Sequence, residues 1–407
     1  MTLVLPAASL SPARAASAAV PIVKFVDQAL IYAYAEGASD IHFEATRQGL
    51  QLKYRLDGVM RAGDLLEGVQ AAEEAISRIK VMAQLDITER RRPQDGRIHW
   101  AEKQLDLRVS IMPSLFGEDA VLRLLDKTQL RETNSTALTL ASLGFEAACA
   151  NDIRKLAARP HGMLLVTGPT GSGKTTTVYA ALSEVNDGLE KIITIEDPVE
   201  YELPGTLQIP VNEQKGLTFA TGLRSILRHD PDKILVGEIR DAETAQIAVQ
   251  SALTGHLVFT TVHANSLPDV LGRFQHFGID PFGFASALNG VVVQRLLRRL
   301  CRECVQTRDL TRDEQQQTSR AVKITTVPKV MGCAHCSGTG YKGRFVVAEV
   351  HTLTAKLRDM IVQRSNLGDM TALLAQESDK QLLAQALRSV QLGETSLEEV
   401  SRVIGWE

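Results

Sequence analysis

A glycine-rich segment that ends in lysine and threonine has the spacing of a phosphate-binding loop. It occupies residues 168–175 and follows an apolar, strand-like stretch, Met163–Thr167. Such glycines let backbone N–H groups point at a phosphate, and the helix that follows adds partial positive charge. In this pattern Lys174 reaches the β- and γ-phosphates and the Thr175 hydroxyl binds Mg²⁺. The predicted nucleotide-binding residues here are Gly168, Pro169, Thr170, Gly171, Ser172, Gly173, Lys174, Thr175 and Thr176.

Carboxylates follow two later apolar stretches of the same kind. Glu196, Asp197 and Glu200 come after the letters KIITI, and Glu238 comes after KILVG. Carboxyl ends of neighbouring parallel strands meet beside a phosphate loop, where a general base or a ligand of Mg²⁺-bound water would be placed. For the first group the alternative is a solvated acidic turn. The stretch that ends at Glu238 resembles a Walker-B strand, a motif in which aspartate is usual at this position. The longer side chain of glutamate suits a contact with Mg²⁺ through water.

Two histidines flank a further apolar stretch, LVFTTV. His256 precedes it and His263 follows it. A single histidine at a strand end is more often structural than catalytic, but two beside one strand of this sheet make a functional role equally plausible. Of the two, we expect His256 to sense the γ-phosphate.

Four of the five cysteines form two Cys-x-x-Cys pairs, Cys301 with Cys304 and Cys333 with Cys336. Paired knuckles of this kind predict a tetrahedral zinc site, and four thiolates leave no coordination position for a substrate, so the zinc is expected to be structural. The alternative is a set of reduced, unliganded cysteines or a redox pair. Cys149 lies in a helical pattern and is expected in the core.

The elements that position these residues change character along the chain. Residues 21–127 predict an α+β domain, with helices near 22–34 and 69–85 and alternating strands such as 50–56. Later, short apolar strands alternate with helices, which is typical of a parallel sheet covered on both faces. The predicted segments are a leader at 1–20, a linker at 128–140, and a P-loop domain at 141–407 that includes a zinc subdomain at 301–345 and a helical end at 350–407.

Arg295, Arg298 and Arg299 form a basic run just before the first cysteine pair. We interpret this run as a solvated or partner-facing helix, with a contact to nucleic acid as the alternative.

Composition excludes several classes of protein. Of the 407 residues 44% are hydrophobic and 23% charged, so a disordered chain is excluded. A net charge of -3 and only 5% aromatic residues speak against a helicase or another nucleic-acid-binding protein. No apolar run approaches the roughly 20 residues that a membrane span needs, and the leader lacks the charge pattern of a secretory signal. A small-molecule kinase would need an acceptor pocket, for which the sequence has no signature.

Together these segments resemble the type II secretion and type IV pilus assembly ATPases, from about residue 20 to the end of the chain. The resemblance is carried by ordered blocks that read ASDIHFE, YRLDG, RRRPQDGR, DLRVS leading to VLRLLDK, GPTGSGKTTT, TIEDPVEY, LRSILRHDPDKILVGEIRD, TGHLVFTTVHAN, QRLLRRLC with the tetracysteine, and TGYKGR. The phosphate loop alone would indicate only an NTPase, whereas the whole series is specific.

The resemblance implies an α/β fold, with a RecA-like P-loop domain, a smaller N-terminal α+β (PAS-like) domain and a zinc-binding tetracysteine subdomain. It implies a homo-hexamer at the cytoplasmic face of the inner membrane that uses ATP, Mg²⁺ and Zn²⁺ to power protein secretion or assembly of a pilus-like fibre. The implied partners are inner-membrane platform or docking proteins and an acidic phospholipid surface, without direct nucleic-acid contact. A retraction or DNA-uptake motor is the alternative within the family. Since retraction motors usually lack the tetracysteine, assembly or secretion is favoured.

The resemblance also implies roles for individual residues. Glu200 resembles the acidic-box residue that polarises the attacking water, Glu238 the atypical Walker-B glutamate, and His256 a member of the histidine box. Lys174 and Thr175 match the positions that bind phosphate and Mg²⁺. The arginines expected to serve the nucleotide or a neighbouring subunit are Arg108, Arg123, Arg224, Arg228 and Arg240.

Two departures from the family pattern stand out. The chain is expected to lack the additional N-terminal domain through which many members dock onto a membrane protein. Gly117-Glu118-Asp119 replaces the usual Gly-Glu-Arg. This reversal of charge is expected to weaken a contact between domains or subunits.

Overall fold

The computed structural model describes residues 22–100, 103, 105–125, 138–318, 324–375 and 381–406. The leader expected at 1–20 and nearly all of the linker expected at 128–140 lie outside the described residues. The chain divides into two compact units, Met1–Thr136 and Ala137–Glu407. Each unit has its own hydrophobic core.

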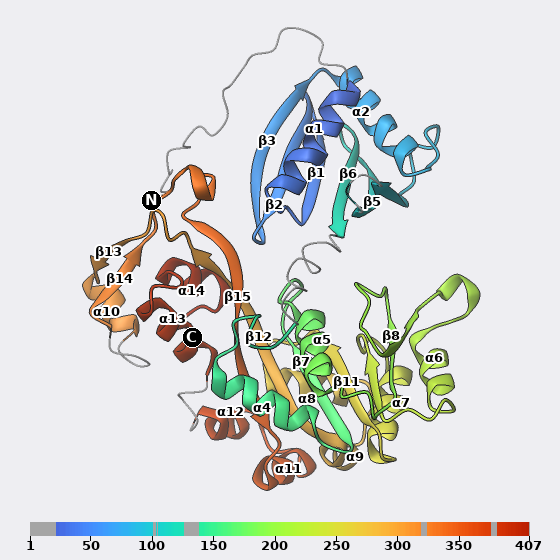
Figure 1. The fold of residues 1–407 in the computed structure, drawn as a ribbon, viewed down its shortest axis with the longest axis vertical. Helices are drawn as coiled ribbons and strands as arrows, with labels where there is room; N and C mark the ends of the chain where they lie inside the picture. Colours follow the sequence, from blue (N-terminus) through green and yellow to red (C-terminus); the bar gives the residue numbers. More distant parts are fainter. Residues whose placement is uncertain are drawn as a thin grey trace. The chain divides into compact units, whose positions relative to one another are not determined.

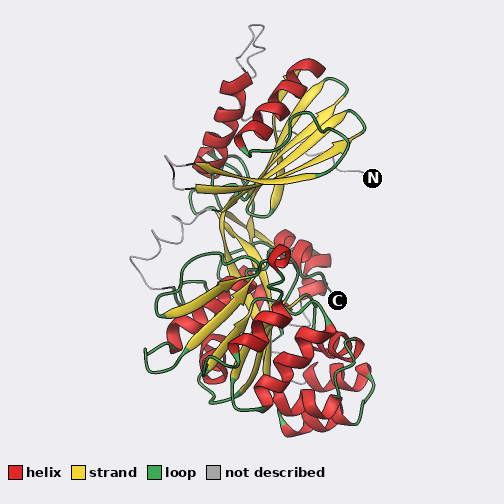
Figure 2. Cartoon of the chain, turned by 90° about the vertical axis from the view of Figure 1, so that its right-hand side faces the viewer, coloured by secondary structure: helices red, strands yellow, loops and turns green. Residues whose placement is uncertain are grey.

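In its described residues, the N-terminal unit is a six-stranded antiparallel sheet with two helices, α1 (Ile22–Ala35) and α2 (Val69–Met82), on one face (Figures 1 and 2). The strands lie in the order β3-β2-β1-β6-β5-β4. The helices cover the face toward which alternate strand residues such as Leu50 and Leu52 point. The strand bounds are β1 Asp40–Thr46, β2 Gly49–Leu56, β3 Val59–Glu67, β4 Gln94–Trp100, β5 Leu105–Ser114 and β6 Gly117–Leu125.

The C-terminal unit is built on a seven-stranded sheet in the order β15-β12-β7-β11-β10-β8-β9 (Figure 1). The four apolar strands expected from the sequence, β7, β8, β10 and β11, are parallel as predicted. Only β15, at the edge of the sheet, runs antiparallel to its neighbour β12. The strand bounds are β7 Gly162–Thr167, β8 Ile192–Glu196, β9 Thr206–Pro210, β10 Lys233–Val236, β11 Leu257–Val262, β12 Leu288–Leu300 and β15 Tyr341–Thr352.

Helices cover both faces of this sheet, as the near-continuous apolar strands predict. Alternate residues of β7 enter different cores: Met163 and Leu165 pack on one side, Leu164 and Val166 on the other. One side carries α4 (Ala147–Ala157) and α5 (Lys174–Val185), and Cys149 of α4 is buried there as expected. The opposite side carries α6 Phe219–Ile226, α7 Ala242–Leu253, α8 Leu267–His276 and α9 Pro281–Ala287.

The remaining elements surround the long strands β12 and β15. Among the described residues, a two-stranded ribbon, β13 with β14, lies near helix α10, and four more helices follow β15. Their bounds are β13 Gln306–Asp309, α10 Arg312–Thr318, β14 Thr326–Lys329, η4 Ala334–Cys336, α11 Ala355–Val362, α12 Leu367–Ala375, α13 Leu382–Gln391 and α14 Leu397–Val403. The short helix η3 (Glu213–Lys215) lies apart from them, between β9 and α6 in the chain.

The basic run at 295–299 lies in strand β12, so the helix expected there is wrong. The strand forms because β12 pairs with both β7 and β15, and these pairings between distant segments leave no trace in the local pattern. Arg298 pairs with the fully buried Glu399 at 2.7 Å and lies over the ring of Tyr341. Arg299 pairs with Glu394 at 3.3 Å. These two arginines therefore hold the C-terminal helices against the sheet.

Candidate nucleotide site and tetracysteine cluster

The glycine-rich loop joins β7 to α5, and two of its glycines are required by the backbone path. Gly168 has a φ of 150°, and a Cβ there would lie 2.5 Å from the carbonyl oxygen of Gln294 and 2.7 Å from Ser172 Oγ. Gly173 is left-handed, with a φ of 82°, directly before the first residue of α5. A side chain at either position would be strained. The loop therefore presents backbone N–H groups at a helix N-terminus, as a phosphate cradle requires.

Lys174 is the first residue of α5, and its side chain is buried under the loop. Its ammonium donates to the carbonyl oxygens of Gly168 at 3.0 Å and Pro169 at 3.1 Å. Burial lowers the pKa of Lys174, Glu238 partly offsets this effect, and Arg295 adds to it. The ammonium thus places a positive charge inside the loop, where phosphate oxygens can pair with it.

The three carboxylates near the end of β8 have different surroundings. Glu196 is only 2% exposed and accepts hydrogen bonds from three side chains, those of Tyr179, Thr194 and Gln208. Its oxygens are sheltered and already have donors, so Glu196 does not suit a water-activating base. Asp197 is exposed, with its carboxylate 3.6 Å from Arg240. Glu200 is exposed in the same loop.

Glu238, Arg240 and His263 form a connected group beside Lys174. Glu238 and Arg240 follow β10 and form an ion pair, while His263 follows β11. Nε2 of His263 lies 3.5 Å from Glu238 Oε2, and its Nδ1 lies 3.5 Å from Lys174 Nζ. Burial and then the Lys174 charge lower the pKa of His263, against an opposing effect of Glu238. These effects favour the neutral form of the imidazole at pH 7.

The structure does not bring His256 to this group. His256 directly precedes β11, and its carbonyl oxygen accepts a hydrogen bond from the N–H of Gly162, the first residue of β7. Because β7 and β11 are parallel, His256 lies at their amino ends, whereas the phosphate loop and His263 lie at their carboxyl ends. A strand of this length spans roughly 20 Å. Within one chain it is His263 that lies beside the phosphate loop.

Arg224 and Arg228 lie next to each other, although only Arg224 is in the helix. Arg224 belongs to the last turn of α6, which ends at Ile226, so Arg228 lies just beyond the helix. Arg228 instead donates to the carbonyl oxygen of Arg224 at 2.9 Å. Arg224 pairs with Glu243 at 2.7 Å, and both side chains are about half exposed. Arg224 and Arg228 thus form an exposed, positively charged patch at the end of α6.

Arg108 and Arg123 face each other across β5 and β6 in the N-terminal unit, and Arg97 of β4 faces Arg108 on its other side. Directly opposed residues share a face of a sheet, so the three arginines form one row of positive charge. Arg123 pairs with Asp40 at 2.8 Å. Nη2 of Arg108 is buried without a hydrogen-bond partner in the described part of the chain.

The residues that replace the usual Gly-Glu-Arg stabilise their own unit. Glu118 pairs with Lys80 at 2.6 Å, and the Lys80 side chain is only 1% exposed. Asp119 accepts hydrogen bonds from the N–H of Ala45 at 2.7 Å and from Ser114 Oγ at 3.1 Å. The aspartate thus ties β6 to β1, a role that an arginine side chain could not take because it has no acceptor.

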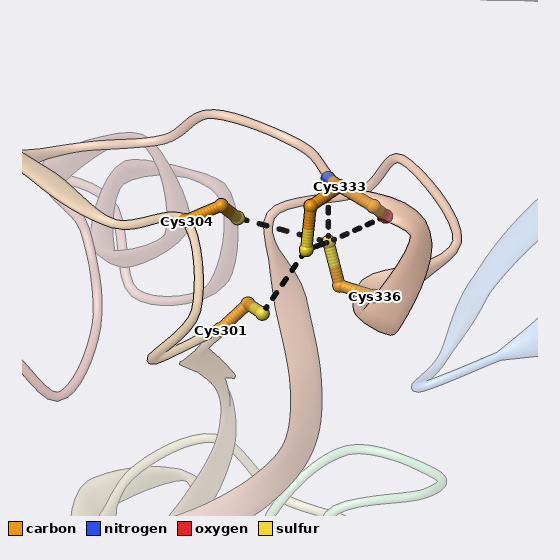
Figure 3. Close-up of side chains that lie close together, drawn as sticks. All are labelled: Cys301, Cys304, Cys333 and Cys336. Atoms are coloured by element: carbon orange, nitrogen blue, oxygen red, sulfur yellow. Dashed lines mark hydrogen bonds between the residues drawn. The ribbon is translucent and has the colours of Figure 1, made fainter.

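The four cysteines of the two knuckles converge (Figure 3). Cys301 and Cys304 follow β12, while Cys333 directly precedes the short helix η4 and Cys336 is its last residue. All four Sγ atoms lie within 4.8 Å of one another, and three separations are 3.7 or 3.8 Å. Thiolates bonded to tetrahedral zinc at about 2.3 Å would lie about 3.8 Å apart. The cluster therefore fits zinc.

The backbone around Cys336 favours its thiolate form. The N–H groups of Cys333 and Gly340 donate to Cys336 Sγ at 3.3 and 3.1 Å. Although burial opposes them, these hydrogen bonds lower the pKa of Cys336 to about 6. A thiolate, rather than a thiol, is the ligand that a metal binds.

Three residues at the nucleotide site were not expected there from the sequence: Gln294, Arg295 and Arg273. Gln294 is fully buried and donates to the carbonyl oxygen of Ser172 in the phosphate loop at 2.6 Å. Arg295 and Arg273 donate to backbone carbonyls of the segment around His263. The signal that could have found Gln294 and Arg295 is a polar pair inside the apolar run that reads VVVQRLL. Arg273 lies in an ordinary amphipathic helix and has no such signal.

Comparison with known proteins identifies the family of the chain. The family described as Type II/IV secretion system protein matches residues 15–402. The chain belongs to this family. Type II secretion system ATPase E of Vibrio cholerae is 43% identical over 386 residues, which cover 94% of this chain and 75% of the relative. Type IV pilus assembly ATPase PilB of Myxococcus xanthus is 42% identical over 389 residues, covering 93% of this chain and 67% of the relative.

The fold is also found in a solved structure. The X-ray structure of the Legionella pneumophila ATPase DotB matches with a TM-score of 0.65 at 19% identity, covering 93% of this chain and 95% of that one. The family and the α/β ATPase fold expected from the sequence are thus confirmed, and the chain is an ATP-hydrolysing enzyme of this family. None of the helices in the described ranges is long and apolar enough to cross a membrane.

Proposed function

We propose that the chain is the subunit of a hexameric motor in which ATP hydrolysis powers type II protein secretion or assembly of a type IV pilus-like fibre. The observation that carries this proposal is the meeting of Lys174, Glu238 and His263 at the phosphate loop of a secretion-family chain. The motor would act at the cytoplasmic face of the inner membrane. Docking or platform proteins of the secretion or pilus machine and an acidic phospholipid surface would hold it there.

The residues of the site divide the chemistry among them. Lys174 pairs with the β- and γ-phosphates, and Glu200 polarises the water that attacks the γ-phosphate. Asp197 is the second candidate for this base, because it is exposed in the same loop whereas Glu196 is buried. His263 senses the γ-phosphate, the role first expected of His256, because its imidazole adjoins Lys174.

ATP is bound together with Mg²⁺, which neutralises phosphate charge during the transfer. Thr175 and Glu238 offer the oxygen donors that this ion prefers. One carboxylate oxygen of Glu238 faces Arg240 and the other faces His263, so a contact with the ion through water suits this residue. In the tetracysteine, zinc has a structural role, since four protein ligands complete its coordination.

The arginines connect hydrolysis to movement. Arg108 and Arg123 belong to the N-terminal unit, across the linker from the phosphate loop, and the row that they form would serve as the clamp on bound nucleotide. Loss of the γ-phosphate would release this clamp, which turns a change of charge into a domain rotation. Arg224, Arg228 and Arg240 serve the same nucleotide or the one bound by a neighbouring subunit.

The decisive experiment measures ATPase activity over a protein dilution series, with the assembly state followed by sedimentation. Activity per chain is expected to rise as rings form, and Arg108→Ala should lower turnover far more than it lowers ATP affinity. Arg78→Ala, which changes an arginine on helix α2 of the same unit, is the matched control. Flat activity from monomer to hexamer, with Arg108→Ala unaffected, would contradict the ring mechanism.

The same assay distinguishes the classes of function. Stimulation by vesicles of acidic phospholipid supports the secretion or pilus motor. Stimulation by DNA would instead support a nucleic-acid motor, and phosphate transfer to a metabolite would support a kinase.

A further inference from the structure

The segment that carries His263 is held through four consecutive backbone carbonyls. Thr167 Oγ1 donates to the carbonyl oxygens of Val262 at 3.1 Å and Ala264 at 2.7 Å. It also accepts a hydrogen bond from the N–H of Ala264 at 3.1 Å. The remaining two carbonyls, those of His263 and Asn265, accept hydrogen bonds from arginines. The backbone on both sides of the imidazole is therefore held by side chains from other elements.

Arg273 holds the middle of this segment from helix α8. Its Nη1 donates to the carbonyl oxygen of His263 at 3.3 Å, and its guanidinium lies over the ring of Phe277 at 5.7 Å. Nε of Arg273 is buried and lacks a hydrogen-bond partner among the residues that the structure describes. Arg273 also lines a cleft of about 670 Å³ together with Arg240 and His263. A direct contact with phosphate is therefore the competing role that a test must separate.

Arg295 holds the end of the segment from strand β12. Its Nη2 donates to the carbonyl oxygen of Asn265 at 3.2 Å, and its Nη1 donates to that of Gln294 at 3.0 Å. Gln294 in turn donates to the phosphate loop at Ser172. One guanidinium thus connects the strand beside the phosphate loop to the histidine segment. A lysine has a single ammonium without this planar fork, so it would not span both acceptors equally well.

We infer that Arg273 and Arg295 are positioning residues for His263, which hold its backbone so that the imidazole stays between Lys174 and Glu238. The inference rests on the proposed role of His263 as the γ-phosphate sensor. Neither arginine needs to touch the nucleotide in this role. Each acts through the geometry of the histidine, and a misplacement of about 1 Å at a reacting centre costs on the order of a hundredfold in rate.

The test introduces Arg273→Lys and Arg295→Lys, each in the wild-type chain and in a His263→Ala chain. In the wild-type background we expect each substitution to lower kcat about tenfold, with ATP affinity changed less than about twofold. In the His263→Ala background neither substitution should lower kcat further, because the group that they position is gone. The affinity is measured with a non-hydrolysable ATP analogue, and the melting temperature of every variant is recorded without ligand.

Arg154→Lys is the matched control, since Arg154 pairs with Glu184 in the same domain and lies outside the histidine segment. It should leave kcat unchanged. Equal losses of kcat in both backgrounds would overturn the inference, and so would a loss of ATP affinity as large as the loss of kcat, which would indicate direct phosphate binding. If His263→Ala itself leaves turnover unchanged, the proposed role of His263 fails and the inference fails with it. If His263→Ala lowers turnover but both lysine variants keep full activity, the inference is overturned while the proposed role of His263 stands.

Discussion

The Nδ1 atom of His263 lies 3.5 Å from Nζ of Lys174, although 89 positions separate the two residues in the chain. The contact exists because β7 and β11 are adjacent and parallel, so the loops at their carboxyl ends meet. An imidazole beside the phosphate-binding lysine is placed to respond to a charge that arrives with the nucleotide. The catalytic predictions below depend on this relationship and on the acidic loop after β8.

Lys174→Ala and Glu200→Gln are expected to impair different steps, ATP binding in the first variant and hydrolysis in the second. Removal of the ammonium should abolish productive ATP binding. Glu200→Gln should keep binding and slow turnover about a hundredfold or more, as the loss of a general base does. Binding of a fluorescent ATP analogue and steady-state hydrolysis separate the two effects. If Glu200→Gln hydrolyses ATP at the wild-type rate, Asp197 becomes the candidate base, because Glu196 is buried and already hydrogen-bonded.

His263→Ala should lower turnover more than His256→Ala. The imidazole of His263 contacts Lys174 and Glu238, whereas His256 lies at the opposite ends of the same strands. The comparison is made by kcat at saturating ATP, with the melting temperature of each variant as the control for folding. A larger loss for His256→Ala would mean that its role is exerted through a contact outside its own chain.

Cys333→Ser should release one equivalent of zinc and destabilise the fold around residues 300–345. Thiolate binding to zinc is coupled to local folding, so the loss of one ligand affects both. Zinc per chain is measured by elemental analysis, and stability by thermal unfolding. Cys149→Ala, which changes a buried cysteine of helix α4, should keep the metal. Wild-type protein prepared without chelator and found free of zinc would count against the site.

Glu399→Gln is expected to lower the free energy of unfolding by about 3–5 kcal/mol at pH 7, because it leaves charged arginines at a buried site. Glu399 is fully buried and paired with Arg298 and Arg402. Although burial opposes them, these arginines lower the pKa of Glu399. A carboxyl with a lowered pKa stabilises the fold above its unfolded pKa and loses this effect as the pH falls.

The difference between wild type and Glu399→Gln should therefore narrow below about pH 4, near the unfolded pKa of glutamate. Urea unfolding of both proteins at pH 7 and again below about pH 4 measures this difference in the free energy of unfolding. Glu398→Gln changes the neighbouring, largely exposed carboxylate and should cost less than about 1 kcal/mol, as for other exposed ion pairs. Equal costs for the two variants would show that burial of the Glu399 pair does not decide its strength.

Much of the fold follows from short-range patterns. The helix at α1, the alternating strand β2 and the strand–loop–helix around 168–175 all lie where the sequence predicts them, because local hydrophobic period and turn chemistry determine such elements. The phosphate loop and the two cysteine pairs are equally local, since each places its chemistry within a few residues. The family was recognisable from these blocks in order.

Only the tertiary structure shows features that depend on contacts between segments far apart in the sequence. The basic run is a strand because β15, some fifty residues later, pairs with it, and a local pattern cannot contain that partner. Both histidines adjoin the same strand in sequence, yet only the parallel register of β7 and β11 shows which one lies at the phosphate loop. Glu196 is indistinguishable from its acidic neighbours until Tyr179 and Gln208 are seen to bury it. Sequence alone thus determined which chemistry the chain carries, and long-range packing determined which residues are close enough to perform it.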